Sequence, residues 1–182
     1  MLPISPASHW PAVVSRQSSA PYRQRMNSTK FESGDQLHEW MGLALSEAEA
    51  AGAEGEVPIG AVVVVDGEVV SRRHNEREAT GDPTAHAEVL ALRDAAAHVG
   101  KWRLSEATLV VTLEPCPMCA GAAWAARLGH VVWGAANDDA GAMGSLYNLA
   151  ADPRLNHEHP VTAGVRADEC SALLVDFFTE RR

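Results

Sequence analysis

Apolar residues recur along the chain at two different spacings, and the change from one to the other predicts the order of its helices and strands. Between 36 and about 52, Trp40, Leu45 and Ala48 fall near one stripe while Glu47 lies outside it, which predicts an amphipathic helix. Short apolar runs bounded by turn residues predict strands. The predicted order is helix 36–52, strands 56–64 and 68–74, helix 84–98, strand 107–113, helix 117–128, strands 131–134 and 159–166, and helix 167–182.

This order of elements predicts the class of fold. Asp66-Gly67 between the first two strands is a hairpin turn signal. Strand 107–113 is apolar at most positions, as in a strand that is buried on both faces. A long polar loop with room for one short helix is predicted over 137–156. A hairpin followed by helix–strand repeats predicts one α/β domain over 36–182, with three layers and a mixed five-stranded sheet that carries helices on both faces.

Residues 1–35 differ in composition from the rest of the chain. Serine is frequent, proline recurs often enough to interrupt any helix, and the apolar core of a secretory signal is missing. We therefore predict a disordered N-terminal extension over 1–35, within which Met26 is a candidate for the true start. An organellar transit peptide is the alternative, because the first acidic residue is Glu32, although the prolines disfavour the amphipathic helix that such a peptide needs.

The helix predicted over 117–128 is apolar on almost every side. It is rich in alanine and contains Trp124. A helix without a polar face is buried in its own domain or covered by a partner. We therefore expect the protein to form a homodimer through this helix.

The formal net charge of −9 limits the kinds of partner. Residues 1–35 carry +2 and the remaining chain carries −11, whereas a general nucleic-acid-binding protein is basic. The substrate is therefore small, or RNA contacts only a local basic surface. The candidate surfaces, each of which also fits an ordinary solvated face, are Arg72, Arg73 and Arg77, then Lys101 and Arg103, then Arg181 and Arg182.

Cysteine usage and hydropathy limit the compartment. The chain has three cysteines, and two of them share one short motif, so a disulfide framework is not expected. No apolar run reaches the length that spans a bilayer. These features predict a protein of a reducing, cytoplasmic compartment without a membrane partner.

A C-x-x-C motif follows the strand predicted over 107–113. Pro115 disfavours helix for the residue before it, and Pro117 suits a first helical position, so Cys116 is predicted to cap a helix. Cys119 lies three residues further on and faces the same side of the first turn. The positive end of the helix favours thiolates, which are the form of cysteine that binds metal ions.

A second helix start brings a histidine and a glutamate. The segment 82–84 has the capping residue and the proline of a helix N-terminus, which places His86 in or near the first turn. His86, Cys116 and Cys119 are predicted to hold one zinc ion per chain, with the fourth position open for water. Glu88 is two residues from His86 and does not share its helix face, so we predict that it moves the protons of that water.

Two other kinds of site contain a C-x-x-C motif. A structural zinc site with four cysteines is excluded because only Cys170 remains besides the motif. A structural site of two cysteines and two histidines, with no position left for water, remains an alternative, since seven other histidines exist. A redox-active pair would require a thioredoxin-like context, which this sequence lacks.

The H-x-E and P-C-x-x-C motifs, with Cys116 28 positions after Glu88, resemble the signature of the zinc-dependent cytidine/deoxycytidylate deaminase superfamily. Within it, residues from about 37 to 182 are most similar to the bacterial-type tRNA adenosine deaminases. The similar segments are VPIGAV at 57–62, DPTAHAE at 82–88, VTLEPC at 111–116, MCAGA at 118–122, GSL at 144–146, DEC at 168–170 and DFF at 176–178. The resemblance implies a cytidine deaminase-like fold and a homodimer.

The resemblance also implies an activity. In that subfamily adenosine at the wobble position, the first of the anticodon, becomes inosine by hydrolysis, with zinc activating the water that attacks C6 and Glu88 carrying protons. The implied partner is a tRNA anticodon stem-loop, whose target base leaves its stack. By resemblance, Asn75 hydrogen-bonds the target nucleoside, and the backbone N–H of Ala87 helps hold the base.

The chain departs from the subfamily at one candidate residue. Where relatives often have Arg-Asp, this chain has Ala136-Asn137. An aspartate can only accept a hydrogen bond from a ribose hydroxyl, whereas Asn137 can also donate one. We therefore expect a weaker requirement for the ribose 2′-hydroxyl.

Two alternative functions remain. The acidic charge favours a deaminase of a free nucleobase or mononucleotide, such as guanine or deoxycytidylate. A non-catalytic zinc-binding subunit is the other alternative, and Glu88 argues against it because a structural site has no need of a proton carrier.

Overall fold

The computed structural model describes residues 33–181, so most of the predicted extension over 1–35 lies outside the described residues. The last residues of that range do not fit the prediction. Helix α2 (Gly34–Ala53) begins two residues before the predicted start at Gln36 because Ser33 caps it. The Gln36 N–H donates to Ser33 Oγ at 3.3 Å, and the Ser33 N–H donates to Gln36 Oε1 at 3.0 Å.

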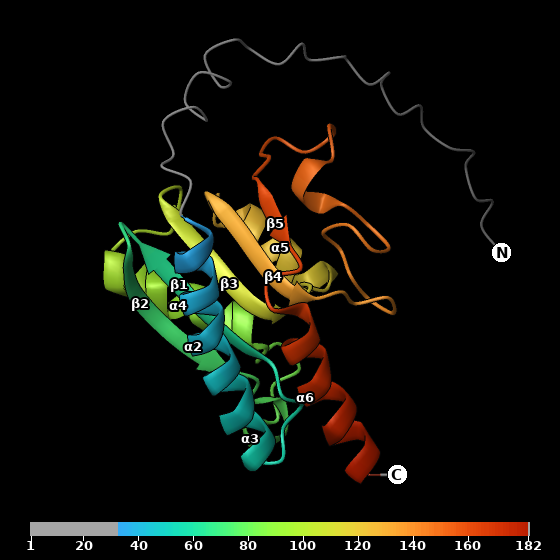
Figure 1. The fold of residues 1–182 in the computed structure, drawn as a ribbon. Coiled ribbons are helices and arrows are strands. Elements are labelled where there is room, and N and C mark those ends of the chain that lie inside the picture. Colours follow the sequence, from blue (N-terminus) through green and yellow to red (C-terminus); the bar gives the residue numbers. More distant parts are fainter. Residues whose placement is uncertain (1–32, 182) are drawn as a thin grey trace, which may run out of the picture. The chain divides into compact units, whose positions relative to one another are not determined.

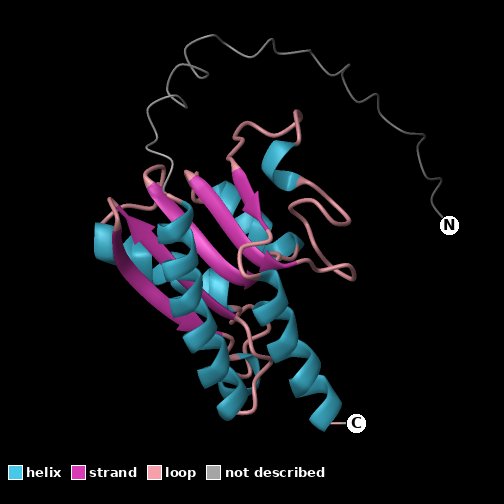
Figure 2. Ribbon diagram, viewed as in Figure 1, coloured by secondary structure: helices cyan, strands magenta, loops and turns pink. Residues whose placement is uncertain are grey.

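The remaining helices and strands follow the predicted order, with one short helix added between the second strand and the next long helix (Figure 2). Their bounds are β1 (Gly60–Val65), β2 (Glu68–His74), α3 (Arg77–Thr80), α4 (Ala87–Val99), β3 (Ala107–Leu113), α5 (Pro117–Ala125), β4 (His130–Ala135), η1 (Leu149–Ala151), β5 (Val161–Ala163) and α6 (Ala167–Glu180).

One mixed sheet of five strands carries the domain, with the order β2-β1-β3-β4-β5. Strand β1 pairs antiparallel with both β2 and β3, while β3, β4 and β5 run parallel. Figure 1 shows α2 and α6 on one face of this sheet and α4 and α5 on the other. The predicted three-layer α/β fold is confirmed.

Alternate side chains of the strands enter two separate cores, as the two-residue repeat of a strand requires. Val62 and Val64 of β1 pack with Trp40 of α2, whereas Val63 packs on the opposite face with Ala91 of α4. Strand β3 lies in the middle of the sheet and is buried at every position except its last. It is therefore covered on both faces, as predicted, and it delivers the chain to the C-x-x-C motif from a rigid position.

Two element starts next to the candidate site differ from the prediction. Helix α4 begins at Ala87 rather than at 84, because Asp82 Oδ1 accepts from the Thr84 N–H at 2.7 Å and closes a turn instead of capping the helix. Strand β1 begins at Gly60 rather than at 56. The residues before it form a loop in which Glu56 is buried.

Other differences lie further from the site. Helix α5 ends at Ala125 instead of 128, since Arg127 adopts a left-handed backbone with φ 57°. The short helix α3 was not predicted, and β5 covers only part of the predicted strand 159–166. Phe178 of α6 is 50% exposed. Among the residues described, no helix is both long and apolar enough to cross a bilayer.

Candidate metal centre and active site

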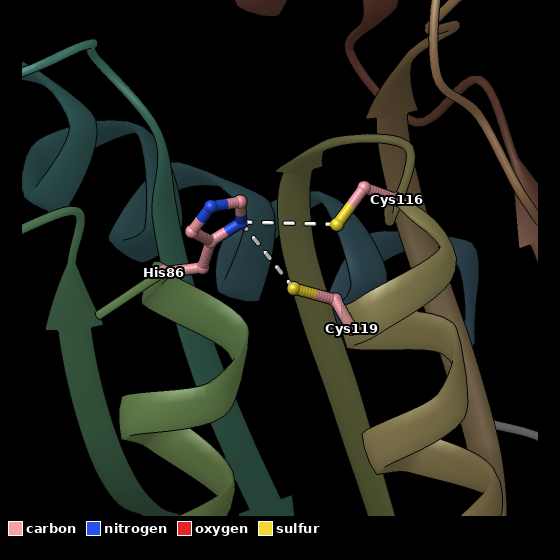
Figure 3. Close-up of side chains that lie close together, drawn as sticks. All are labelled: His86, Cys116 and Cys119. Carbon is pink, nitrogen blue, oxygen red and sulfur yellow. Dashed lines mark hydrogen bonds between the residues drawn. The ribbon is translucent and has the colours of Figure 1, made fainter. Parts of the chain in front are cut away.

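Two helix N-termini bring a histidine and two cysteines together. His86 is the N-cap residue of α4, directly before its first turn, and Cys116 is the N-cap residue of α5 with Pro117 at the first helical position. Cys119 lies in the first turn of α5 and is buried. Figure 3 shows the three side chains converging, with His86 Nδ1 at 3.8 Å from Cys116 Sγ and at 3.5 Å from Cys119 Sγ.

These distances test whether the three residues can hold a metal ion. Their ligand atoms all lie within 4.8 Å of one another. With metal–sulfur bonds of about 2.3 Å and metal–nitrogen bonds of about 2.0 Å at tetrahedral angles, a sulfur and a nitrogen ligand lie about 3.5 Å apart. The arrangement therefore fits a tetrahedral ion, and it supplies three ligands from protein side chains.

The three groups affect one another's protonation. The Cys119 thiol beside it lowers the pKa of Cys116 to about 4, with His86 adding to the effect, and the same contact raises the pKa of Cys119. The contact with Cys116 also raises the pKa of His86. A cation placed among them would displace the protons that these groups share, because thiolate and neutral imidazole are the forms that bind metal.

Glu88 lies beside this cluster without belonging to it. Its side chain is buried, and its Oε2 has no hydrogen-bond partner in the part of the chain that the structure describes. Burial raises the pKa of Glu88, although the neighbouring His86 partly opposes this. A buried carboxyl group with one free oxygen next to a metal site is suited to carry a proton. Its predicted role as proton carrier stays a prediction.

Asn75 and Ala87, both predicted to contact the substrate, lie near the same helix start. Asn75 is buried, and the N–H of the next residue, Glu76, donates to the carbonyl oxygen of Ala85 at 3.0 Å. Ala85 directly precedes His86. The N–H of Ala87, at the first position of α4, has no partner within the helix, as is general for a first turn. Their contacts with a substrate stay predictions.

The side chain of Asn75 has a buried partner that the sequence patterns did not reveal. Its Nδ2 donates to Glu56 Oε2 at 3.0 Å, and the Ala79 N–H donates to Glu56 Oε1 at 2.8 Å. The one available signal in the sequence is an acidic residue directly before the apolar segment VPIGAV. That signal does not distinguish a buried carboxylate from a solvated one.

Glu114 organises the loop that follows β4. Its carboxylate accepts from the backbone N–H groups of Met143 at 2.9 Å, Ser145 at 3.0 Å and Asn137 at 3.2 Å, and also from the Ser145 hydroxyl. Burial alone would raise the pKa of Glu114, but these hydrogen bonds outweigh it and lower the pKa. The Ala142 N–H of the loop donates to the carbonyl oxygen of Pro115 at 2.9 Å, which ties the loop to the start of the C-x-x-C motif.

Asn137, the residue at which the chain departs from the subfamily, uses its side chain inside this loop. Its Oδ1 accepts from the Ala140 N–H at 3.0 Å, while its Nδ2 lies 3.5 Å from the carbonyl oxygen of Glu114, a long and weak contact. The structure therefore gives Asn137 a part in shaping the loop. The weakly held Nδ2 is the side-chain atom available to contact a ribose, and that contact stays a prediction.

Comparisons with known proteins agree with what the geometry of the site indicates. The family model of the MafB19-like deaminases matches residues 35–182. A tRNA-specific adenosine deaminase of Bacillus subtilis (strain 168) is 48% identical over 143 residues, which cover 79% of this chain and 89% of the relative. This chain belongs to the tRNA-specific adenosine deaminase family. The predicted resemblance is confirmed.

Solved structures place the family within a wider group of deaminases. A structure from a study of A-to-I editing by tRNA:A34 deaminases at the wobble position of transfer RNA has a TM-score of 0.73 and 42% identity, and the match covers 75% of this chain and 99% of the other. A guanine deaminase from Nitrosomonas europaea has a TM-score of 0.69 at 25% identity, covering 94% and 100%. The fold is common to both, and the identity is higher to the tRNA deaminase.

The basic groups predicted as candidate RNA contacts differ in whether their charges are paired with acidic side chains. Arg72 pairs with Glu47 at 2.9 Å, and Arg73 pairs with Glu76 at 2.8 Å, so both charges are largely neutralised. Arg77 is exposed, forms no ion pair within residues 33–181, and lies close enough to His86 to oppose its protonation. Of this first group, Arg77 is best placed to contact a phosphate near the site.

The other two groups are less suited to that role. Lys101 and Arg103 follow the C-terminus of α4, and a helix of 13 residues is about 20 Å long, so they lie far from His86 at its N-terminus. Arg181 lies over the ring of Phe177 and donates to the carbonyl oxygen of Gly55 at 2.9 Å. Arg182 lies outside the described residues.

Proposed function

We propose that the protein converts adenosine to inosine at the wobble position of a tRNA by hydrolysis, with one zinc ion held by His86, Cys116 and Cys119. The observation that carries this proposal is the three-ligand cluster with the buried Glu88 carboxyl group beside it. The 48% identity to a tRNA-specific adenosine deaminase supports the choice of substrate. The free thiols of the site suit a reducing compartment, which we propose is the cytoplasm.

Glu88 performs the proton transfers in this account. Zinc, when bound, supplies a Lewis acid that makes a water nucleophilic near neutral pH. Hydrolytic deamination moves protons from that water to a ring nitrogen and then to the departing amine, and Glu88 Oε2 is the buried atom free to relay both. Because burial raises its pKa, Glu88 holds a proton more readily than an exposed glutamate.

The remaining residues hold the base. We propose that the Asn75 side chain and the Ala87 N–H bind the target nucleoside, which must leave the anticodon stack to reach a buried site. A loop gives up a base more readily than a duplex does, which favours an anticodon stem-loop as partner. The exposed Arg77 is the proposed contact for a flanking phosphate.

The function can be tested with the zinc-loaded full chain and an anticodon stem-loop that carries adenosine at the first anticodon position. We expect inosine and an equal amount of ammonia, measured by nucleoside mass spectrometry and an ammonia assay. Free guanine and deoxycytidylate are offered in parallel reactions. Ammonia from either small substrate, with none from the stem-loop, would contradict the proposal in favour of a nucleobase or mononucleotide deaminase.

Asn137 is expected to lower the preference for RNA over DNA. Because an aspartate cannot donate a hydrogen bond, Asn137→Asp should raise the ratio of RNA to DNA hairpin turnover by roughly 10-fold, the value of about one hydrogen bond. Initial rates on matched RNA and DNA hairpins measure this ratio. The neighbouring exposed Asp138→Asn is the control, and a natural chain that already turns over no DNA would refute the expectation.

We also propose a homodimer through α5. Its apolar residues leave an outer face that the domain only partly covers, and a side chain added at Gly121 would extend into open space. Sedimentation velocity at micromolar concentration should show a dimer for the natural chain and a monomer for Gly121→Glu, because a charge in an apolar interface is costly. Ala172→Glu, on exposed α6, should remain dimeric. A monomeric natural chain would contradict this proposal.

A further inference from the structure

Glu56 is a buried carboxylate outside the metal cluster. It is only 1% exposed. Its backbone N–H donates to the Ala51 carbonyl oxygen at 2.9 Å, which fixes its position at the end of α2. Its two side-chain oxygens accept from Asn75 Nδ2 and from the Ala79 N–H. Both partners are neutral, so within residues 33–181 no ion pair compensates for burying this carboxylate.

Such an arrangement is costly for stability, and a neutral side chain would be easier to bury. A carboxylate differs from a neutral polar side chain in that it only accepts hydrogen bonds and does not donate them. An asparagine amide can be turned by half a rotation with little change in shape. A carboxylate facing it permits only one of the two orientations, with Nδ2 toward Glu56 and Oδ1 away from it.

A backbone hydrogen bond links the segment that carries the Asn75 amide to the segment directly before the metal cluster. The N–H of Glu76, the residue after Asn75, donates to the carbonyl oxygen of Ala85, and Ala85 precedes His86. The Ala79 N–H, bound by the other oxygen of Glu56, belongs to α3 in the same connection between β2 and α4. Glu56 therefore fixes both the amide and the loop that carries it toward the site.

We propose that Glu56 is a positioning residue that orients the Asn75 amide, so that its Oδ1 accepts a hydrogen bond from the target nucleoside. The proposal rests on the proposed function, in which Asn75 contacts that nucleoside. It assigns to Oδ1 a donor of the substrate, either an exocyclic N–H or a ribose O–H.

Exchanging the carboxylate at position 56 with the amide at position 75 tests the orientation. Glu56→Gln leaves a single oxygen at this position, which must go to Ala79 or to Asn75. If the oxygen bonds Ala79, the new amide donates to Asn75, which turns and presents Nδ2 to the substrate. Asn75→Asp alone places two carboxylates against each other. When Glu56→Gln and Asn75→Asp are combined, the introduced amide donates to the introduced carboxylate and accepts from Ala79, so an oxygen faces the substrate again.

The measurement is kcat and KM for inosine formation in an anticodon stem-loop, together with zinc content and thermal unfolding. We expect each single substitution to lower kcat/KM about 10- to 100-fold with zinc retained. The double substitution should recover to within about 10-fold of the natural chain, since each donor again faces an acceptor and an oxygen again faces the substrate. Glu54→Gln, which removes a more exposed carboxylate two residues away, is the matched control.

The outcomes separate this proposal from the function on which it rests. No inosine from the natural chain contradicts the proposed function, whatever the variants do. Inosine from the natural chain, with a double variant that is unfolded or no better than the weaker single variant, overturns the orienting role of Glu56. If Glu56→Gln alone fails to fold, the double variant decides, and its recovery of folding and activity supports the role.

Discussion

Glu88→Gln is expected to lower the turnover of the zinc-loaded enzyme by about 10²- to 10⁴-fold, the usual contribution of a general acid–base group. Glutamine keeps the shape of the side chain but cannot take up and release the proton. Because His86, Cys116 and Cys119 form the metal cluster without Glu88, zinc content should not change. Single-turnover rates with an anticodon stem-loop, together with metal analysis of the same sample, measure both effects.

Two controls define this experiment. His86→Ala should lose both zinc and activity, because it removes one of the three ligands. Glu78→Gln, at an exposed position of α3, should keep both. If Glu88→Gln loses zinc in the way His86→Ala does, Glu88 is a ligand, and the division of roles between ligands and proton carrier is wrong.

Glu114→Gln is expected to destabilise the protein by roughly 2–4 kcal/mol, because a buried acceptor of several N–H groups becomes partly a donor. The loop from Asn137 to Ser145 depends on that acceptor. Since the loop is tied to Pro115, next to Cys116, activity should fall as well. Denaturant unfolding gives the free energy, and amide hydrogen exchange at Met143 and Ser145 reports the loop.

The pH dependence of this effect follows from the lowered pKa of Glu114. A carboxylate with a folded-state pKa below its ordinary value of 4.5 contributes its full stability above that pH and loses it as the pH falls through the lowered pKa. The difference in stability between the natural chain and Glu114→Gln should therefore shrink in acid. Ser145→Ala removes one donor only and should cost about 1 kcal/mol.

A Glu114→Gln variant with natural stability and unchanged exchange at Met143 and Ser145 would show that Glu114 does not organise the loop. A stability loss that stays constant as the pH falls below 4.5 would remove the ionised form as its cause.

The convergence of the three candidate metal ligands could be predicted from the sequence because each position depends on a local rule. Pro115 and Pro117 make Cys116 the N-cap of α5, and three-residue spacing places Cys119 on the same face. The start of α4 was harder, since Asp82 caps a turn at Thr84 and leaves His86 as the cap of the helix. The error was local, and it moved the histidine by less than one turn.

The buried carboxylates could not be predicted because their partners are distant in the sequence. Glu56 meets Asn75 nineteen residues later, and Glu114 meets the Ser145 N–H after 31 residues. Nothing in the composition around either glutamate shows that it will be buried, since burial follows from the packing of the sheet and loops. The roles of these two glutamates therefore become apparent only in the tertiary structure.

X-ray absorption of zinc in the purified full chain tests the central claim most directly. We predict one zinc per chain, with two sulfur ligands at about 2.3 Å, one imidazole nitrogen at about 2.0 Å and one further oxygen that no side chain supplies. Absence of bound zinc, or a fourth ligand contributed by a protein side chain, would contradict an open site formed by His86, Cys116 and Cys119.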